Sequence, residues 1–205
     1  MIEENLLKAG LENIAGVDEA GRGACAGPLV IAAVILQDLR SEKLAKVTDS
    51  KKLTPKLREL LFDTIVENSI AYSIIEISST EIDEIGLQRS NIEGMRRVVN
   101  ALATKPDYVL TDGYSIPGLV TPNLAVWKGD QVALSISAAS ILAKVHRDRI
   151  MLDMDSQYPG YGFAEHKGYA TAAHEAAMRA LGVLGIHRRS YANVAEIAKI
   201  NPQFQ

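Results

Sequence analysis

The hexapeptide Asp18-Glu19-Ala20-Gly21-Arg22-Gly23 is the most constraining feature of this chain, and it directly follows an apolar stretch at residues 14–17. Two adjacent carboxylates repel each other unless a positive group lies between them, and a hard divalent cation prefers such oxygen ligands. The glycines let the backbone approach a bulky anion closely, and the arginine offers a rigid set of donors to phosphate oxygens. The hexapeptide therefore indicates metal-dependent phosphate chemistry at the end of a predicted strand.

The hexapeptide has two other interpretations, and for the acidic pair taken in isolation the first of them, a solvated turn, is the more common one. An acidic pair at a strand end is commonly a solvated turn, because acids are mostly exposed. A dinucleotide-binding fingerprint needs the pattern G-x-G-x-x-G with an acid about 20 residues later. Here the glycines are Gly21, Gly23 and Gly27, and the acids precede them. The spacing and the order both argue against that fingerprint.

The hydrophobic pattern predicts an α/β fold. Stretches rich in β-branched and apolar residues predict strands at 13–17, 28–36, 70–77, 107–111 and 124–127. Helices are predicted at 55–68, from 79, and at 88–104, 137–157, 171–181 and 193–199, the first of them opened by Thr54 and Pro55. Without repeats or a low-complexity linker, we expect a single domain over residues 1–205, with a helical C-terminal segment from about residue 160.

Two further acids lie where such a fold gathers its active site, at strand ends and on inward helix faces. Asp112 follows the apolar strand at 107–111 and precedes Gly113. Asp148 shares a helical stripe with Ile141, Val145 and Leu152. A buried acid is costly unless it is paired or metal-bound, so Asp148 has two interpretations, a buried salt bridge or a metal ligand. Together with the hexapeptide, these acids predict a site for two metal ions.

Composition limits the classes of function. The net charge of −3 excludes a uniformly basic nucleic-acid-binding surface, although separate basic clusters around Lys51, Lys144 and Lys167 remain available to line a groove. No apolar run is long enough to span a bilayer, and the acidic N-terminus lacks the features of a secretory signal. With Cys25 as the one cysteine, an intramolecular disulfide is excluded, and we expect a cytoplasmic protein without membrane contact.

Taken in order, the motifs resemble those of the ribonuclease HII family over residues 14–191. The motifs that carry the resemblance are the hexapeptide with Gly27-Pro28, Asp49-Ser50-Lys51-Lys52-Leu53, Thr111-Asp112-Gly113, Lys128-Gly129-Asp130, Ser137-Ala138-Ala139-Ser140-Ile141-Leu142-Ala143-Lys144, Arg147-Asp148-Arg149, Tyr161-Gly162-Phe163 and His166-Lys167-Gly168-Tyr169. The related type HIII enzymes lack the Gly-Arg-Gly sequence, which favours type HII. The resemblance implies a ribonuclease H-like fold, with a mixed central sheet flanked by helices and a helical C-terminal segment.

The resemblance also implies an activity and a set of roles. The expected enzyme hydrolyses the RNA strand of RNA/DNA hybrids and nicks duplex DNA on the 5' side of an embedded ribonucleotide, leaving 5'-phosphate and 3'-hydroxyl ends. It would remove misincorporated ribonucleotides and RNA primers. By the same resemblance, four carboxylates hold two Mn²⁺ or Mg²⁺ ions, and seven further residues contact the substrate. The carboxylates are Asp18, Glu19, Asp112 and Asp148, and the substrate-binding residues are Gly21, Arg22, Gly23, Tyr169, Lys51, Lys144 and Lys167.

Other assignments stay open at this point. Asp130 is either a further acid near the site or, as its place after Gly129 favours, part of a turn. A non-catalytic nucleic-acid-binding domain gains nothing from acids opposite phosphate. Another two-metal nuclease of the same superfold, or a metal-independent glycosidase with paired carboxylates, would differ in substrate or in its response to a chelator. We expect a monomer. A sliding clamp is a conceivable partner, but residues 201–205 do not form a recognisable clamp-binding peptide.

Overall fold

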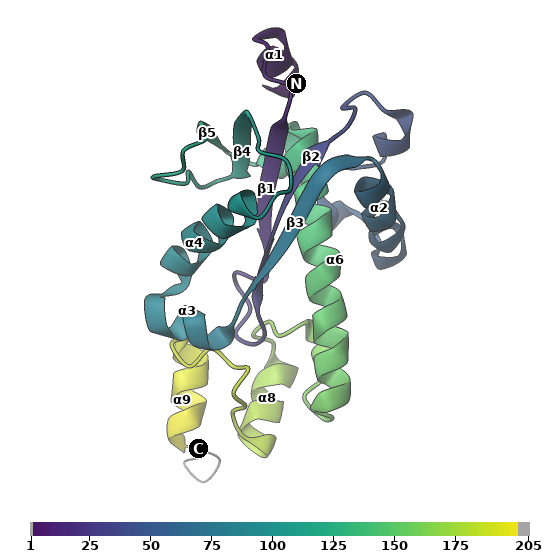
Figure 1. The fold of residues 1–205 in the computed structure, drawn as a ribbon. Coiled ribbons are helices and arrows are strands. Elements are labelled where there is room, and N and C mark those ends of the chain that lie inside the picture. The colour runs from purple at the N-terminus through teal and green to yellow at the C-terminus, as the bar shows by residue number, and fades with distance from the viewer. Residues whose placement is uncertain (1, 201–205) are drawn as a thin grey trace. The chain divides into compact units, whose positions relative to one another are not determined.

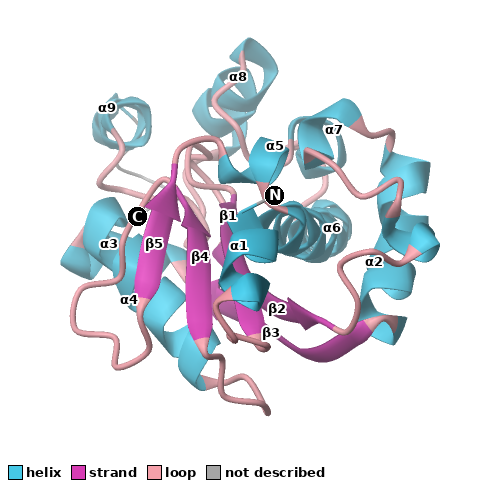
Figure 2. Cartoon of the chain, turned by 90° about the horizontal axis from the view of Figure 1, so that it is seen from above, coloured by secondary structure: helices cyan, strands magenta, loops and turns pink. Residues whose placement is uncertain are grey.

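The structure, a computed structural model, describes residues 2–200, and the side chain of residue 200 is not described. Its centre is a five-stranded mixed sheet with the strand order β3-β2-β1-β4-β5 (Figures 1 and 2). The strands are β1 (Ile14–Ala20), β2 (Leu29–Leu36), β3 (Ser69–Ile77), β4 (Tyr108–Asp112) and β5 (Asn123–Val126). Strand β1 is antiparallel to β2 and parallel to β4, and β4 is parallel to β5.

Burial explains the sequences of the central strands. All eight residues of β2 are buried, which matches its unbroken apolar sequence LVIAAVIL. Strand β1 is buried along most of its length although it contains Asp18 and Glu19. It therefore extends three residues beyond the predicted end at Val17, so the two acids lie within the strand.

Helices flank the sheet (Figure 2). Helix α2 begins as predicted, because Thr54 Oγ1 accepts a hydrogen bond from Leu57 N (3.3 Å) and Pro55 occupies the first helical position. The longest helix, α6, starts three residues before its predicted start. The helices are α1 (Ile2–Lys8), α2 (Pro55–Glu67), α3 (Ser79–Ile85), α4 (Leu87–Asn100), α5 (Gly129–Val132), α6 (Leu134–Gln157), α7 (Phe163–His166), α8 (Ala172–Leu181) and α9 (Ala192–Ile200), with short 3-10 turns at Glu42–Leu44 and Ser50–Lys52.

The chain divides into two compact units, each with its own buried apolar cluster. The first unit comprises Met1–Ala20, Val30–Ile75 and Asn91–Val145, and one of its clusters joins Ile14, Leu110 and Ile136. The second unit comprises Gly21–Leu29, Glu76–Ser90 and His146–Gln205, and its cluster is centred on Phe163, Met151 and Met178. The expectation of a single domain over 1–205 stays a prediction.

Three further expectations concern membrane contact, the buried face of α6 and the C-terminal peptide. Among the described helices, none is both long and apolar enough to cross a membrane. Leu152, which we predicted to share an inward stripe with Asp148, is 47% exposed, so the buried stripe of α6 does not extend that far. The five C-terminal residues considered as a clamp-binding peptide lie outside the described residues.

Candidate active site

Strand β1 presents the first two acids of the site. Asp18 is buried and Glu19 is partly exposed, as expected for neighbours that point to opposite faces of a sheet. Asp18 Oδ1 accepts a hydrogen bond from the backbone N–H of Glu19 (2.7 Å). The register pairs Asp18 with Ala32 and Glu19 with Ile31 of β2, so the ladder continues through both acids and fixes their positions.

Strand β4 brings Asp112 to the same edge of the sheet. Val17 of β1 pairs with Thr111 of β4 in a parallel register, so Asp18 and Asp112 follow at corresponding positions. Asp112 Oδ1 accepts a hydrogen bond from Gly129 N (2.7 Å), at the start of the short helix α5. Parallel strands present their carboxyl ends together, and here this geometry gathers two acids that are 94 residues apart in the sequence.

Asp130 is a buried acid of the same region, where the sequence favoured a turn. It lies in helix α5 and is only 4% exposed. Its backbone carbonyl accepts from Ser137 Oγ (2.8 Å), and its Oδ2 lies 3.8 Å from Nζ of Lys51, a largely exposed side chain. The residue before α5, Lys128, has a left-handed backbone (φ 52°), and this turns the chain sharply from β5 into the helix.

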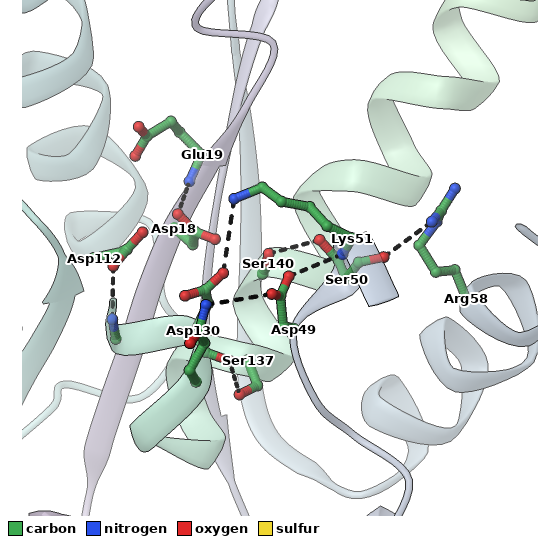
Figure 3. A network of polar contacts seen from close by, with 12 residues as sticks. Asp18, Glu19, Asp49, Ser50, Lys51, Arg58, Asp112, Asp130, Ser137 and Ser140 are labelled. Atoms are coloured by element: carbon green, nitrogen blue, oxygen red, sulfur yellow. Dashed lines mark hydrogen bonds and ion pairs between the residues drawn. The ribbon is translucent and has the colours of Figure 1, made fainter. Parts of the chain in front are cut away.

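A third segment, the 3-10 turn Ser50–Lys52, borders these acids (Figure 3). Asp49 caps this turn by accepting from Lys51 N (2.9 Å), and its Oδ2 lies 3.5 Å from Gln131 Nε2. Ser50 Oγ and Ser140 Oγ are 2.9 Å apart, which connects the turn to helix α6. Figure 3 shows Asp18, Asp112, Asp130 and Asp49 around the extended side chain of Lys51.

The electrostatics show that these groups interact. Burial raises the pKa of Asp18 well above its usual value, and the nearby Glu19 and Asp112 carboxylates raise it further, while a hydrogen bond from Ser140 opposes the shift. Burial, followed by Asp112 and Asp49, likewise raises the pKa of Asp130. For Lys51, burial acts to lower the pKa, but the surrounding carboxylates outweigh it and the pKa is raised. The site thus carries an excess of negative charge that one lysine only partly balances.

The donor set suits a hard divalent cation, because it consists of carboxylate oxygens whose mutual repulsion a cation would relieve. Within residues 2–200, however, no three acidic, histidine or cysteine side chains converge closely enough to chelate an ion as they lie. The carboxylates therefore have the chemistry of a metal site, and they would need side-chain adjustment to close around an ion.

The Gly-Arg-Gly loop, residues 21–23, belongs to the second unit and begins immediately after β1. Gly21 has φ +88°, and a Cβ atom on it would lie 1.9 Å from Nε of Arg147, so no other residue fits there without displacing that side chain. A Cβ on Gly23 would lie 3.7 Å from the Tyr169 ring. Arg22 Nη2 donates to Gln88 Oε1 (3.0 Å).

The buried Arg147 supports both this loop and Tyr169. Its guanidinium donates to the carbonyls of Pro28 (2.9 Å), Ala26 (3.0 Å) and Lys167 (2.9 Å), and burial lowers its pKa to about 10, so it stays charged at neutral pH. Its Cζ lies 5.7 Å from the centre of the Tyr169 ring, which is 40% exposed. In the sequence, Arg147 stands out only as part of the motif Arg147-Asp148-Arg149, which does not indicate this role.

The predicted site residues are thus distributed over both units. Asp18, Glu19, Asp112, Lys51 and the half-buried Lys144 lie in the first unit, whereas residues 21–23, Asp148, Lys167 and Tyr169 lie in the second. Asp148 is half-buried on α6, and Lys167 ends α7 with a left-handed backbone (φ 50°). Asp49 and Asp130 are the acids whose burial beside the predicted ones the sequence did not indicate.

Known proteins are similar to this chain in sequence and in fold. The family model described as Ribonuclease HII matches residues 15–194. Ribonuclease HII of Mycobacterium ulcerans is 55% identical over 197 residues, which cover 96% of this chain and 82% of that relative. The crystal structure of the ribonuclease H2 from Pyrococcus horikoshii is 30% identical and aligns with a TM-score of 0.80 over 93% of this chain and 99% of that one.

Two further similar structures were solved with a partner protein or with a metal ion. Ribonuclease HII from Archaeoglobus fulgidus, solved in its complex with PCNA, is 26% identical with a TM-score of 0.75, over 90% of this chain and 96% of that one. Bst ribonuclease HIII, solved in complex with Mn²⁺, is 19% identical with a TM-score of 0.66 and covers 93% of this chain and 70% of its own, which supports the fold alone. The matches to family, relative and fold agree with the resemblance inferred from the motifs. The chain therefore belongs to the ribonuclease HII family and is a hydrolase of the ribonuclease H type.

Proposed function

We propose that this enzyme hydrolyses the RNA strand of RNA/DNA hybrids and nicks duplex DNA on the 5' side of an embedded ribonucleotide, leaving 5'-phosphate and 3'-hydroxyl ends. One observation carries the proposal: Asp18 and Asp112 lie at corresponding positions of adjacent parallel strands, close enough that the Asp112 carboxylate raises the pKa of Asp18. A cation bound between them would relieve this repulsion. This arrangement supports phosphodiester hydrolysis, whereas a protein that only bound nucleic acid would gain nothing from buried acids opposite phosphate.

Asp18, Glu19, Asp112 and Asp130 are the residues that we assign to hold two divalent ions, Mn²⁺ or Mg²⁺. When bound, such ions activate a water for in-line attack and stabilise the leaving oxygen. Asp130 joins this set because it is buried and its pKa is raised by Asp112. The family resemblance assigns the fourth role to Asp148 instead, and activity of the Asp130→Asn and Asp148→Asn variants distinguishes the two assignments.

The remaining residues bind and orient the substrate. The surrounding carboxylates raise the pKa of Lys51, so its ammonium group is charged beside them. Its largely exposed side chain would contact a phosphate close to these acids. Lys144 and Lys167 are further proposed phosphate contacts. The backbone of Gly21, Arg22 and Gly23 would recognise the 2'-hydroxyl, which is the local group that distinguishes RNA from DNA. The half-exposed ring of Tyr169, held beside Gly23, would contact the adjoining sugar.

Cleavage of a labelled DNA duplex containing one ribonucleotide tests this function directly. The assay compares magnesium, manganese and a chelator, beside the same duplex made only of deoxynucleotides. We expect a metal-dependent nick 5' to the ribonucleotide and no cleavage of the control duplex. Equal cleavage of both duplexes would identify a general two-metal nuclease, and no cleavage by folded protein with either metal would identify a binding protein.

Beyond the substrate, a similar structure suggests one candidate partner protein. The relative from Archaeoglobus fulgidus was solved with PCNA, which supports a sliding clamp as a candidate partner of this enzyme. The C-terminal residues where we considered a clamp-binding peptide lie outside the described residues. A monomeric enzyme in the cytoplasm is the state that we propose for the free protein.

A further inference from the structure

Arg188 is a fully buried arginine that donates to the backbone of the segment containing the Gly-Arg-Gly loop. Its Nε and Nη2 donate to the carbonyl of Gly27 (3.2 and 3.0 Å), and its Nη1 donates to the carbonyl of Arg22 (3.1 Å). Its backbone N–H donates to the carbonyl of Cys25 (2.8 Å). One residue near the end of the chain therefore fixes three carbonyls of residues 22–27.

Tyr191 supplies a second donor to one of these carbonyls. Its hydroxyl donates to the carbonyl of Arg22 (2.8 Å) and accepts from Arg188 Nη1 (2.9 Å). The guanidinium of Arg188 also lies over the Tyr191 ring, with Cζ 5.4 Å from the ring centre. The carbonyl oxygen of Arg22, the middle residue of the loop, is thus held by two donors that also hold each other.

Fixing this carbonyl fixes the amide that follows it. In a trans peptide the C=O and the next N–H are coplanar and point in opposite directions. Since the Arg22 carbonyl points toward the buried Arg188 and Tyr191, the Gly23 N–H points to the opposite side of the loop. Glycine has an unusually free backbone, so this peptide plane would rotate readily without such a constraint.

We infer that Arg188 and Tyr191 are positioning residues that set the preference of this enzyme for a ribonucleotide, because they orient the Gly23 amide that would contact the 2'-hydroxyl. The inference rests on the proposed function, since it assumes that residues 21–23 recognise a ribonucleotide. Neither residue needs to contact the substrate. Their effect is carried through the single peptide group between Arg22 and Gly23.

Tyr191→Phe is the variant that tests this inference, because it removes the hydroxyl and keeps the ring. Tyr161→Phe is the matched control: the Tyr161 hydroxyl contacts the carbonyls of Gly182 (2.7 Å) and Leu181 (3.1 Å), in the same unit but away from the loop. Tyr191→Phe loses the bond to the Arg22 carbonyl and the bond accepted from Arg188, and Tyr161→Phe loses its contacts with two carbonyls, so the two are expected to lose similar amounts of stability. They differ in whether the lost bonds orient the loop.

The measurement is the ratio of dissociation constants, in chelator, for a DNA duplex with one ribonucleotide and for the all-deoxy duplex, followed by fluorescence anisotropy. We expect wild-type protein and Tyr161→Phe to share the same preference for the ribonucleotide, and Tyr191→Phe to lose about three- to tenfold of it, the effect of one hydrogen bond. A matching fall in kcat for nicking, beyond that of Tyr161→Phe, is expected with metal present.

The outcomes separate this inference from the proposed function. If the wild-type enzyme nicks at the ribonucleotide and prefers it in binding, but Tyr191→Phe keeps the full preference, the inference is wrong and the function stands. Wild-type nicking without any binding preference would also overturn the inference, because the loop would then not recognise the hydroxyl in the bound state. If the wild-type protein neither nicks nor prefers the ribonucleotide, the proposed function fails.

Discussion

At the scale of single residues, Asp18 combines two properties that a structural residue would not have. It is buried, and its pKa is raised by burial and by the neighbouring carboxylates of Glu19 and Asp112. Burial and the neighbouring carboxylates disfavour the ionised form of Asp18, so an ionised Asp18 without a cation would cost free energy in the folded state. This cost is understandable if Asp18 serves to bind a cation.

Asp18→Asn is therefore expected to abolish activity and stabilise the metal-free protein. Asparagine keeps the acceptor for the Glu19 N–H and removes the buried charge. We expect cleavage to fall more than about a hundredfold with either metal. In chelator, we expect the free energy of unfolding to rise by roughly 1 to 3 kcal/mol, the usual cost of an uncompensated buried polar group. Urea unfolding and the nicking assay measure the two effects.

Manganese provides the control for this interpretation. A ligand that binds only the folded state stabilises it by mass action, so Mn²⁺ should raise the melting temperature of the wild-type protein more than that of Asp18→Asn. An Asp18→Asn protein with near-wild-type turnover, or one that Mn²⁺ stabilises as much as wild type, would contradict the role of Asp18 as a metal ligand.

The identity of the fourth acid is a second question at the residue scale. Asp130 is buried, and its pKa is raised by burial and by Asp112, whereas Asp148 is half-buried on α6. We expect Asp130→Asn to lower kcat about ten- to hundredfold and Asp148→Asn to lower it less, with both proteins folded. The opposite order in the same assay would return the fourth role to Asp148, as the family resemblance suggested.

At the scale of secondary-structure elements, the site depends on a close approach of β1 to helix α6. Gly16 and Asp18 are two residues apart on β1 and therefore face the same side of the sheet. A Cβ on Gly16 would lie 2.1 Å from the backbone carbon of Ser135, in the first turn of α6. Only glycine permits this distance, which also brings Ser140 of the same helix to Asp18.

Gly16→Ala is consequently expected to destabilise the protein by about 3 kcal/mol or more, because the added methyl meets backbone that no rotamer change can move. Gly185→Ala is the control, since a Cβ there meets nothing within 4 Å and its φ is not positive. Chemical unfolding midpoints of the two variants provide the comparison. A Gly16→Ala protein as stable as Gly185→Ala would show that β1 and α6 are not held at this distance.

The elements also show how much the sequence could predict. Four of the five strands have both boundaries within one residue of the prediction, because their apolar, β-branched runs are bounded by polar residues or glycine and proline. Strand β1 was predicted three residues too short, since charged residues are poor strand formers. Here β2 continues the hydrogen-bonded ladder past the end of the apolar run, through Asp18, Glu19 and Ala20, whereas the pairing with β4 ends at Val17.

Asp130 shows why the sequence favoured a turn over a further acid of the site. In the sequence it is an acid after a glycine, which is typical of an exposed turn. Its burial depends on a tertiary contact, the hydrogen bond from Gly129 N to Asp112, and on the packing of α5 against its neighbours. One signal was available: Asp130 follows a predicted strand, as Asp112 does, so the rule that selected Asp112 applied to it as well.

At the scale of the whole molecule, Asp18 in the first unit and two buried histidines in the second change stability in opposite directions as the pH falls. In the first unit, the pKa of Asp18 is raised by folding, so this residue favours the folded state as the pH falls. The second unit contains a chain of neutral histidines. Leu184 N–H donates to His187 Nδ1 (2.9 Å), His187 Nε2 lies 3.1 Å from His174 Nε2, and His174 Nδ1 lies 2.9 Å from the Tyr169 carbonyl.

These contacts require both rings to be neutral. Because His187 Nδ1 accepts a hydrogen bond, its proton is on Nε2 and is donated to His174 Nε2, which leaves the His174 proton on Nδ1 for the Tyr169 carbonyl. Burial, then the neighbouring His174, lowers the pKa of His187 to about 4. Burial likewise lowers the pKa of His174, which is also stacked on His166 at 4.2 Å.

The sign of the effect on stability follows from these shifts. As the pH falls below about 6.5, the unfolded chain binds protons at these histidines before the folded protein does, so stability is lost progressively until the pH reaches about 4. Asp18 acts oppositely, because the folded protein binds its proton first.

We expect His187→Gln to reduce the loss of unfolding free energy between pH 7 and pH 4.5 by roughly 2 kcal/mol. We expect Asp18→Asn to increase that loss, since its compensating proton uptake is absent. Urea unfolding in chelator at the two pH values measures both changes. If the two variants shift the pH dependence in the same direction, or His187→Gln leaves it unchanged, the neutral histidine chain does not control the acid stability of this enzyme.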